Sequence, residues 1–454
     1  MKSGMRFGLP EKTLMPALTF SFFQAATWLR WLLPVVLVAC AQIPSTPIQT
    51  DPQTLAANAL SEPLDDSAAV QLALHHSPAF QALLNLHQAQ LSDATRQGRI
   101  SNPLFTLDKL RLGQALEIGR SLSFGLLDIL TWPQRRAMAD KRLIEENLRL
   151  SSTVIEQVSQ VRQAWVKAVA AQQQLHYAIQ VREAAQVSHD LARKMLAAGN
   201  FNKLQYARQQ AFELDAQAEF LAASQAQMAS RENLVRLLGL NDAQAQSLQL
   251  PNQLPDLPAA PLSAQTIGAH AHTDRLDVRL AQAQFDSLAQ AQGFKTISTY
   301  TDIELGVQRD SVFDNANASS GSRRGYSVSM KLPLFDWGGL ERQALQAQTL
   351  AAGYNVEAKL AAAGSHVRQA YSAYLNAYQL VTHYKEDVLP LRKTISDEQL
   401  LRYNGMLLSV FDLLADSRES IATVRMALAA QEQFWLMDAN LQSALVGLPT
   451  GDPR

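Results

Sequence analysis

The sequence predicts a mainly α-helical protein made of two structural repeats, each with a very long coiled-coil helix and two β-strands. Three observations lead to this fold class: a heptad pattern of unusual length, a similarity between the two halves of the chain, and segments that alternate apolar and polar residues. The chain has 454 residues, 18% of them charged, and a formal net charge of −1. It shows no basic patch of the kind that nucleic-acid binding requires, so no nucleic-acid partner is expected.

The heptad pattern runs through residues 356–395, where apolar residues recur at alternating steps of four and three. Such a 3.5-residue repeat keeps one seam of a helix facing a partner helix. The expected helix covers about 338–403, and Asn404 and Gly405 are suited to ending it with a positive φ. Pro390 predicts a bend within it, about fifteen residues before Gly405. The seam consists of Val356, Leu360, Ala363, Val367, Ala370, Tyr374, Ala377, Val381, Tyr384, Val388, Leu391 and Ile395.

The two halves of the chain resemble each other at a spacing of about 205 residues. Trp132 and Trp337 precede the long helices, and Gly199 and Gly405 follow them. The expected helices are 67–98 (interrupted at Pro78), 133–198 and 202–238 in the first half, and 265–294, 338–403 and 408–446 in the second. In the second half the two shorter helices together match the long one, which predicts that they stack end to end beside it.

The N-terminal region resembles a bacterial export signal, with basic residues followed by a short apolar run over 31–39. The single cysteine, Cys40, comes directly after this run, and residues 37–40 (LVAC) resemble a lipobox. We therefore expect Cys40 to carry a covalent lipid (palmitate) in a lipoprotein, the alternative being an incidental buried cysteine. The expected parts are a signal peptide (1–39), a lipidated tether (40–64), a first repeat (65–245), a proline-rich linker (246–262), a second repeat (263–449) and a tail (450–454).

Four segments fit β-strands: 104–112, which alternates poorly, 116–126, 297–307 and 326–332. Strands of about ten residues with one apolar face are typical of a transmembrane β-barrel, although a soluble half-buried sheet has the same period. Four strands cannot close a barrel, and open strand edges are not tolerated in lipid, so three chains would be needed for a closed, twelve-stranded barrel. The polar segment 310–324 is expected to be a solvent-exposed hairpin tip.

Four stretches of the chain carry a resemblance to a known family: 121–136 (SLSFGLLDILTWPQRR), 274–293 (DRLDVRLAQAQFDSLAQAQG), 332–342 (LPLFDWGGLER) and 402–418 (RYNGMLLSVFDLLADSR). In their order and spacing they resemble the TolC-type outer-membrane efflux protein family, many members of which are lipoproteins. The resemblance covers about 65–449 and implies a trimer with a twelve-stranded barrel in the outer membrane and an α-helical tunnel in the periplasm. It implies a channel component of a tripartite efflux or secretion system, a passive exit duct that docks onto a periplasmic adaptor and an inner-membrane pump.

The resemblance also implies where the adaptor binds. The turn at Gly199 and Asn200 and the turn at Gly405 would be the periplasmic tips. Four residues match the family's tip pattern, although each glycine would also serve simply to end a helix. The four are Arg402, Tyr403, Gly405 and Ser409.

Asp412 and Asp416 are four residues apart and share a helix face. In a trimer each would recur three times, and a ring facing a lumen would select for cations and hold the mouth closed through pairs with Arg402 or Arg418. The alternative is a solvated outer face. These two aspartates are therefore the predicted lumen gate.

The sequence contains no nucleophile–base set, phosphate loop or dinucleotide fingerprint, so no enzyme is predicted. His75 and His76 are adjacent and point about 100° apart on a helix, so no metal site is expected, and no cofactor beyond the lipid on Cys40. Two other protein classes stay open, a lipid-anchored periplasmic adaptor and a helical scaffold. Adaptors carry one helical hairpin flanked by β-rich segments, and a scaffold leaves the alternating strands unexplained. The sequence does not specify the cargo.

Overall fold

The computed structural model describes residues 62–112, 115–264, 275–298, 302–314, 319–331 and 338–448. Cys40, the expected signal peptide, most of the expected tether, and Trp337 lie outside these residues. In the described part of the chain, no helix is both long and apolar enough to cross a membrane.

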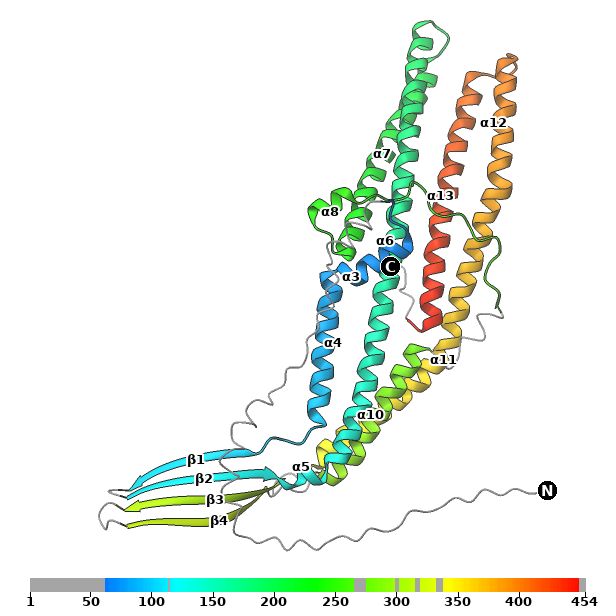
Figure 1. Ribbon diagram of the computed structural model, residues 1–454. Helices are drawn as coiled ribbons and strands as arrows, with labels where there is room; N and C mark the ends of the chain where they lie inside the picture. Colours follow the sequence, from blue (N-terminus) through cyan, green and yellow to red (C-terminus); the bar gives the residue numbers. More distant parts are fainter. Residues whose placement is uncertain are drawn as a thin grey trace, which may run out of the picture. The chain divides into compact units, whose positions relative to one another are not determined.

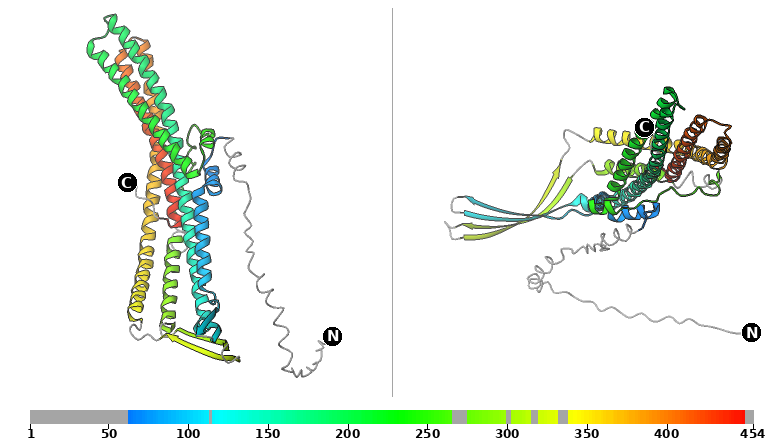
Figure 2. Two further views of the ribbon diagram at one scale, coloured as in Figure 1. Left: turned by 90° about the vertical axis from the view of Figure 1, so that its left-hand side faces the viewer. Right: turned by 90° about the horizontal axis from the view of Figure 1, so that it is seen from above.

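Two long helical hairpins dominate the fold (Figure 1). The first consists of α6 (Trp132–Ala197) and α7 (Lys203–Leu238). The second consists of α11 (Gly339–His383), a π-helical turn η2 (Tyr384–Val388), α12 (Leu389–Asn404) and α13 (Val410–Val446). The two hairpins run side by side in both views of Figure 2, and α6 also contacts α13. The expected long helices over 133–198 and 338–403 are therefore confirmed to within one residue at each end.

The predicted heptad seam is buried in the middle of the second hairpin. Six consecutive seam residues from Ala363 to Val381 are less than 9% exposed, and the five from Val367 onward pack in one cluster with Phe434 and Leu441 of α13. The outer seam positions behave differently, since Leu360 is 48% and Leu391 61% exposed. The chain's own helices therefore cover only the central part of the seam.

A bend was expected near Pro390. The helix there contains the π-helical turn η2, which ends two residues before Pro390. Proline has no N–H and its ring crowds the preceding turn, so a wider turn relieves both problems. The bend itself stays a prediction.

The shorter helices stack end to end beside the long ones, as predicted for the second half. α13 ends at Gly447 (φ 95°), where a Cβ atom would lie 3.0 Å from Cγ of Asp277, at the start of α10 (Leu276–Ser298). The first half repeats this junction. α7 ends at Gly239 (φ 72°), where a Cβ would lie 2.8 Å from Cα of Ser77, which precedes α4 (Pro78–Gln97).

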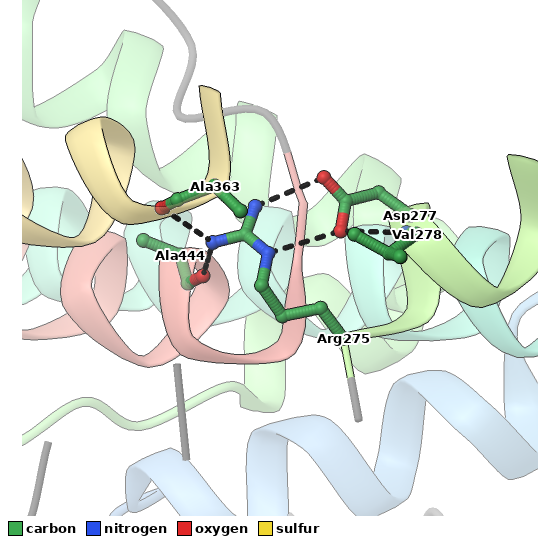
Figure 3. A network of polar contacts seen from close by, with 5 residues as sticks. All are labelled: Arg275, Asp277, Val278, Ala363 and Ala444. Carbon is green, nitrogen blue, oxygen red and sulfur yellow. Dashed lines mark hydrogen bonds and ion pairs between the residues drawn. The ribbon is translucent and has the colours of Figure 1, made fainter. Parts of the chain in front are cut away.

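The junction in the second half is held by Arg275, whose side chain is fully buried (Figure 3). Its Nη1 donates to the carbonyl oxygens of Ala444 (2.9 Å) and Ala363 (3.3 Å), and its Nε and Nη2 donate to the carboxylate of Asp277 (3.0 and 2.9 Å). One guanidinium thus joins α10, α11 and α13. Its charge is matched by Asp277 and by the carbonyl-rich end of α13.

The first half opens with α3 (Asp66–His76), which ends before Pro78 as predicted. The main hydrophobic core of this half packs α3, α6 and α7 around Trp165, whose Nε1 donates to the carbonyl of Leu64 (2.7 Å). After α8 (Asp242–Ser247), the linker over 248–263 forms no helix or strand, and its carbonyl groups accept hydrogen bonds from Trp435 and Tyr378.

The sheet contains one antiparallel hairpin from each half, in the order β1-β2-β3-β4. Its strands are β1 (Leu104–Leu112), β2 (Ala115–Gly125), β3 (Asp302–Asp314) and β4 (Ser319–Lys331) (Figure 1). A short helix, α5 (Leu126–Leu130), links β2 to α6.

Two expectations about the strands were wrong. α10 continues to Ser298, so the strand expected from 297 begins only at Asp302, because α10 packs along α11 and tertiary contact outweighs local alternation. The segment 310–324 is mostly strand rather than loop, with β3 reaching Asp314 and β4 starting at Ser319. Its polar side chains did not prevent pairing, because the ladder satisfies the backbone whatever the side chains are. The turn at 315–318 lies outside the described residues.

Candidate functional site at the helical tips

The first predicted tip is a tight turn that ends α6 and starts α7. Gly199 has a φ of 80°, and the N–H groups of Gly199 and Asn200 donate to the carbonyls of Leu196 and Met195 (3.1 and 2.9 Å). This is a Schellman ending, which needs a left-handed residue at the glycine position. Asn202 then caps α7, and its side chain and that of Gln205 each accept from the other's backbone N–H (2.8 Å). The turn is therefore closed by its own hydrogen bonds.

The second tip has the same ending, but the left-handed residue is Met406. Gly405 has a φ of −78°, so the expectation of a positive φ at Asn404 and Gly405 was wrong. Met406 takes a φ of 58°, and the N–H groups of Met406 and Leu407 donate to the carbonyls of Tyr403 (3.0 Å) and Arg402 (2.9 Å). α12 runs one residue further than the sequence suggested, which moves the strained position onto a methionine.

This second tip presents apolar side chains to solvent. Met406 is 93% and Leu407 81% exposed, and Leu401 on the last turn of α12 is 64% exposed. Two of the predicted contact residues, Arg402 and Tyr403, are exposed beside them. Met406 has a strained backbone, and its side chain lies in water rather than in the core. This combination indicates a surface that binds a partner rather than a residue that packs within the chain.

Ser409 and Asp412, both predicted site residues, contact each other. Ser409 is the N-cap of α13: its Oγ accepts from the N–H of Asp412 (3.3 Å) and donates to the Asp412 carboxylate (2.7 Å). An N-cap serine with an acid three residues later stabilises a helix start. Both residues are exposed, so this capping role leaves Asp412 accessible to solvent ions.

Asp416 lies elsewhere, inside the second hairpin. Its side chain is 4% exposed, accepts from Ser396 Oγ (2.8 Å) and lies 3.8 Å from Nη1 of Arg392, both on α12. Within the single chain Asp416 therefore pairs with Arg392 and fastens α12 to α13. Its expected pairing with Arg402 or Arg418 at the mouth of a trimer stays a prediction.

Arg418 instead joins the two hairpins. It donates to the carbonyl of Arg208 (3.1 Å) and to Gln209 Oε1 (2.9 Å), and its guanidinium lies 4.7 Å from the ring centre of Phe212. Burial among these α7 groups lowers the pKa of Arg418. The cation–π contact and two hydrogen bonds hold α13 against α7.

A contact that the sequence reasoning missed lies closer to the tips. The rings of Phe201 and Phe411 are in contact, with centroids 4.4 Å apart and planes tilted by 30°, and Phe201 is 5% exposed. The only signal in the sequence was a phenylalanine shortly after each tip, which does not by itself indicate that the two meet.

No metal centre accompanies the tips. In the residues that the structure describes, no three histidine, cysteine or carboxylate side chains come close enough to hold an ion. His76 Nε2 lies 3.2 Å from Oε1 of Gln244 and so takes part in packing α3 against α8.

No protein-family model and no curated protein matches the chain. Among solved structures, VceC of Vibrio cholerae, an outer membrane protein, matches with a TM-score of 0.67 and 16% identity, over 84% of this chain and 96% of that one. The Campylobacter jejuni CmeC outer membrane channel matches with a TM-score of 0.67 and 13% identity, over 88% and 87%. The open state of the Neisseria gonorrhoeae MtrE outer membrane channel matches with a TM-score of 0.64 and 17% identity, over 86% and 90%. The likeness therefore extends over the whole architecture.

Proposed function

Since this chain has the fold of the TolC-type outer-membrane channels, we propose that it is the outer-membrane channel component of a tripartite efflux or secretion system. It forms a homotrimer and serves as a passive exit duct for small solutes. The energy for export comes from an inner-membrane pump, which a periplasmic adaptor connects to the tips. Cys40 carries the lipid that anchors the chain in the outer membrane.

The sheet carries this proposal. Within the described residues, β1 pairs only with β2, and β4 pairs only with β3, so one edge of each outer strand has no partner. β1 also exposes large apolar side chains, with Phe105 and Leu107 each 62% exposed. Unpaired edges in lipid are unfavourable, and three four-stranded sheets joined edge to edge remove them in a twelve-stranded barrel.

A second observation supports the trimer. One face of α7 carries a complete heptad seam in which every residue is exposed. Leu214, Leu221 and Met228 on this seam are 62%, 58% and 59% exposed, while Ala216 on another face of α7 is buried within the hairpin. An exposed seam of this kind fits a partner helix from a neighbouring subunit. The seam consists of Leu204, Ala207, Ala211, Leu214, Ala218, Leu221, Gln225 and Met228.

The exposed apolar side chains of Met406 and Leu407 support adaptor binding at the second tip. A helix-hairpin tip on an adaptor would cover these side chains and remove their contact with water. Gly199 and Asn200 at the first tip, and Arg402, Tyr403 and Gly405 at the second, are the accompanying contact residues.

The alternatives account for less of the structure. A periplasmic adaptor carries one helical hairpin flanked by β-rich segments, whereas this chain has two hairpins and one sheet built by both halves. A helical scaffold gives no role to the exposed apolar side chains of the sheet.

The proposal is tested with a Cys40→Ser protein whose export signal is replaced by one cleaved without lipidation. We expect a heat-sensitive trimer of about 140 kDa in detergent that forms ion-conducting pores in planar bilayers. A monomer that stays soluble without detergent would contradict the channel. Metabolic labelling with radioactive palmitate tests the anchor separately, since label in the wild-type chain and none in Cys40→Ser is the expected result.

A further inference from the structure

Three arginines lie in one register row across the sheet. Arg120 on β2 is paired with Arg309 on β3, and Arg309 is paired with Arg324 on β4. Residues directly opposite each other in an antiparallel ladder point to the same face, with Cβ atoms about 4.5–5.5 Å apart. The three guanidinium groups therefore project side by side from one face, and all three residues are exposed.

These three side chains make no ion pair or hydrogen bond in the described part of the chain. Like charges directly opposite each other destabilise a sheet, and nothing in the chain offsets them. On the opposite face of the sheet, by contrast, charged side chains have partners within the chain. There Arg323 lies 3.6 Å from Glu117, and Asp310 accepts from Gln308 (2.9 and 3.1 Å).

The face that carries the row is apolar on the side of the helices and mixed on the side of the hairpin turns. Towards the helices, the next rows are apolar: Leu122, Val307 and Tyr326, then Phe124 and Val328. Tyr326 is 87% and Val307 57% exposed, so these side chains have no cover in the chain. Towards the hairpin turns, this face carries the serines Ser311, Ser320 and Ser322, and with them the apolar residues Leu116, Ile118 and Phe313.

A row of arginines on a largely apolar face has a preferred depth in a membrane. Arginine on the lipid face of a barrel is unfavourable at the bilayer midplane and nearly neutral at the interface, so the row belongs at the level of the lipid headgroups. The hairpin turns are at the end of the sheet away from the helices (Figure 1). With the helices in the periplasm, the row faces the outer leaflet.

We propose that Arg120, Arg309 and Arg324 form a binding site for the phosphate groups of an anionic lipid of the outer leaflet. This inference rests on the proposed function, because it needs the sheet to be in the membrane. Each guanidinium offers a planar fork of donors that matches phosphate oxygens in bidentate geometry. The exposed apolar rows beneath fit the acyl chains of the same lipid, which favours a lipid over a free anion.

The test uses the full-length trimer in detergent and lipid A, which carries two phosphate groups, with binding followed by native mass spectrometry and by thermal stability. Arg120→Gln, Arg309→Gln and Arg324→Gln are combined in one triple variant. A matched pair of single variants separates the two faces, since Arg324→Gln and Arg323→Gln remove the same charge at neighbouring positions that point to opposite sides.

We expect the triple variant to bind lipid A at least about tenfold more weakly than wild type. Arg324→Gln should weaken binding, and Arg323→Gln should leave it unchanged. Lipid A stripped of both phosphates should bind wild type at least tenfold more weakly, and inorganic pyrophosphate at millimolar concentration should not raise thermal stability.

Equal lipid A binding by the triple variant and wild type would overturn the inference, and so would equal binding of the dephosphorylated lipid. If pyrophosphate raised thermal stability as much as lipid A does, the arginine row would be a site for a soluble anion, and its assignment to a lipid would be wrong. Conductance of the wild-type trimer in planar bilayers checks the proposed function independently. If the wild type conducts and the triple variant binds lipid A as well as the wild type does, the lipid site is wrong and the proposed function stands. If the wild type does not insert into the bilayer, the membrane placement on which the lipid site rests is wrong.

Discussion

The rings of Phe201 and Phe411 lie against each other with centroids 4.4 Å apart and planes tilted by 30°, and they join the turn before α7 to the start of α13. The two residues belong to different halves of the chain, so the contact couples the two hairpins close to both tips. Further along the same pair of helices, Arg418 reaches Gln209 and repeats the connection. Opening one tip without the other would therefore break these contacts.

Phe411→Ala should loosen the tips. The substitution removes an aromatic contact and part of a packed side chain, a loss of about 1–3 kcal/mol. We expect amide hydrogen exchange in the first turns of α7 and α13 to quicken by roughly tenfold or more, with a higher single-channel conductance. Phe411→Leu keeps most of the volume and should show a smaller effect, and Leu407→Ala, at a residue 81% exposed, should leave exchange in these turns near the wild-type rate.

The glycines of the two tips should respond differently to alanine. Gly199 has a φ of 80°, so Gly199→Ala should cost about 1 kcal/mol of stability. Gly405 has a φ of −78° and an added Cβ would meet nothing nearer than 3.5 Å, so Gly405→Ala should change stability by less than about 0.5 kcal/mol. Thermal unfolding of the two variants in detergent measures the difference. If Gly405→Ala keeps its stability but loses adaptor affinity in a pull-down, the glycine serves the contact; a large loss of stability would contradict the backbone geometry.

Substitutions of Asp412 and Asp416 should have different effects on the ion selectivity and the conductance of the channel. Asp412 is exposed near the second tip, so Asp412→Asn should lower the cation preference of the trimer, seen as a shift of reversal potential in a potassium chloride gradient. Asp416 is buried against Ser396 and Arg392, so Asp416→Asn should weaken the α12–α13 contact by about 1–3 kcal/mol and raise conductance with little change in selectivity. An unchanged reversal potential in Asp412→Asn would remove the proposed cation ring.

Stability should also depend on pH through Asp438 and Asp66. Burial raises the pKa of both carboxyl groups above the ordinary aspartate value of 3.8, and the nearby Arg162 only partly opposes this. A raised pKa means that the folded chain holds protons that the unfolded chain has released. The penalty for burying the charges is therefore present above the folded pKa, and it disappears as the pH falls through that value towards 3.8.

The thermal midpoint of the wild type should accordingly rise as the pH falls from 7 towards 3.8, relative to Asp438→Asn, which has no charge to lose at this position. At pH 7 the variant should be at least as stable as the wild type. Asp397→Asn alters an exposed aspartate, paired with Lys393, and serves as the control. A larger rise in the variant than in the wild type would contradict the assigned sign.

The long helices could be predicted closely from the sequence because their signals are local and repeated. The heptad seam through Ala363, Val367 and Tyr374 specifies both the helix and its buried face. Gly239 and Gly447 mark helix ends at which only a residue without a Cβ fits. The end-to-end stacking in the second half could be predicted from helix lengths, because the two shorter helices together are about as long as the long helix.

Other features could not be predicted because their causes lie far away in the sequence. Nothing local indicates that Arg275 will reach Ala363 and Ala444, or that Phe201 will meet Phe411. The segment 310–324 was mistaken for a loop because its serines and glycines are typical of turns. In the structure they continue β3 and β4 on the turn side of the arginine row, because the ladder pairs the backbone whatever the side chains are. Met406 took the left-handed position because α12 ended one residue later than the glycine suggested.

The sheet order has a consequence for the time course of folding. β2 pairs with β3, for example Leu122 with Val307, and this contact joins the two halves of the chain. Contacts of such high sequence separation form slowly, because a large loop must be closed before the ladder gains any stability. The helices of the first half can form early, because their contacts are local, whereas β2 keeps an unpaired edge until β3 is available to pair with it. A chain of which only the first half has folded therefore exposes a strand edge that favours aggregation, and completion of the second half removes it.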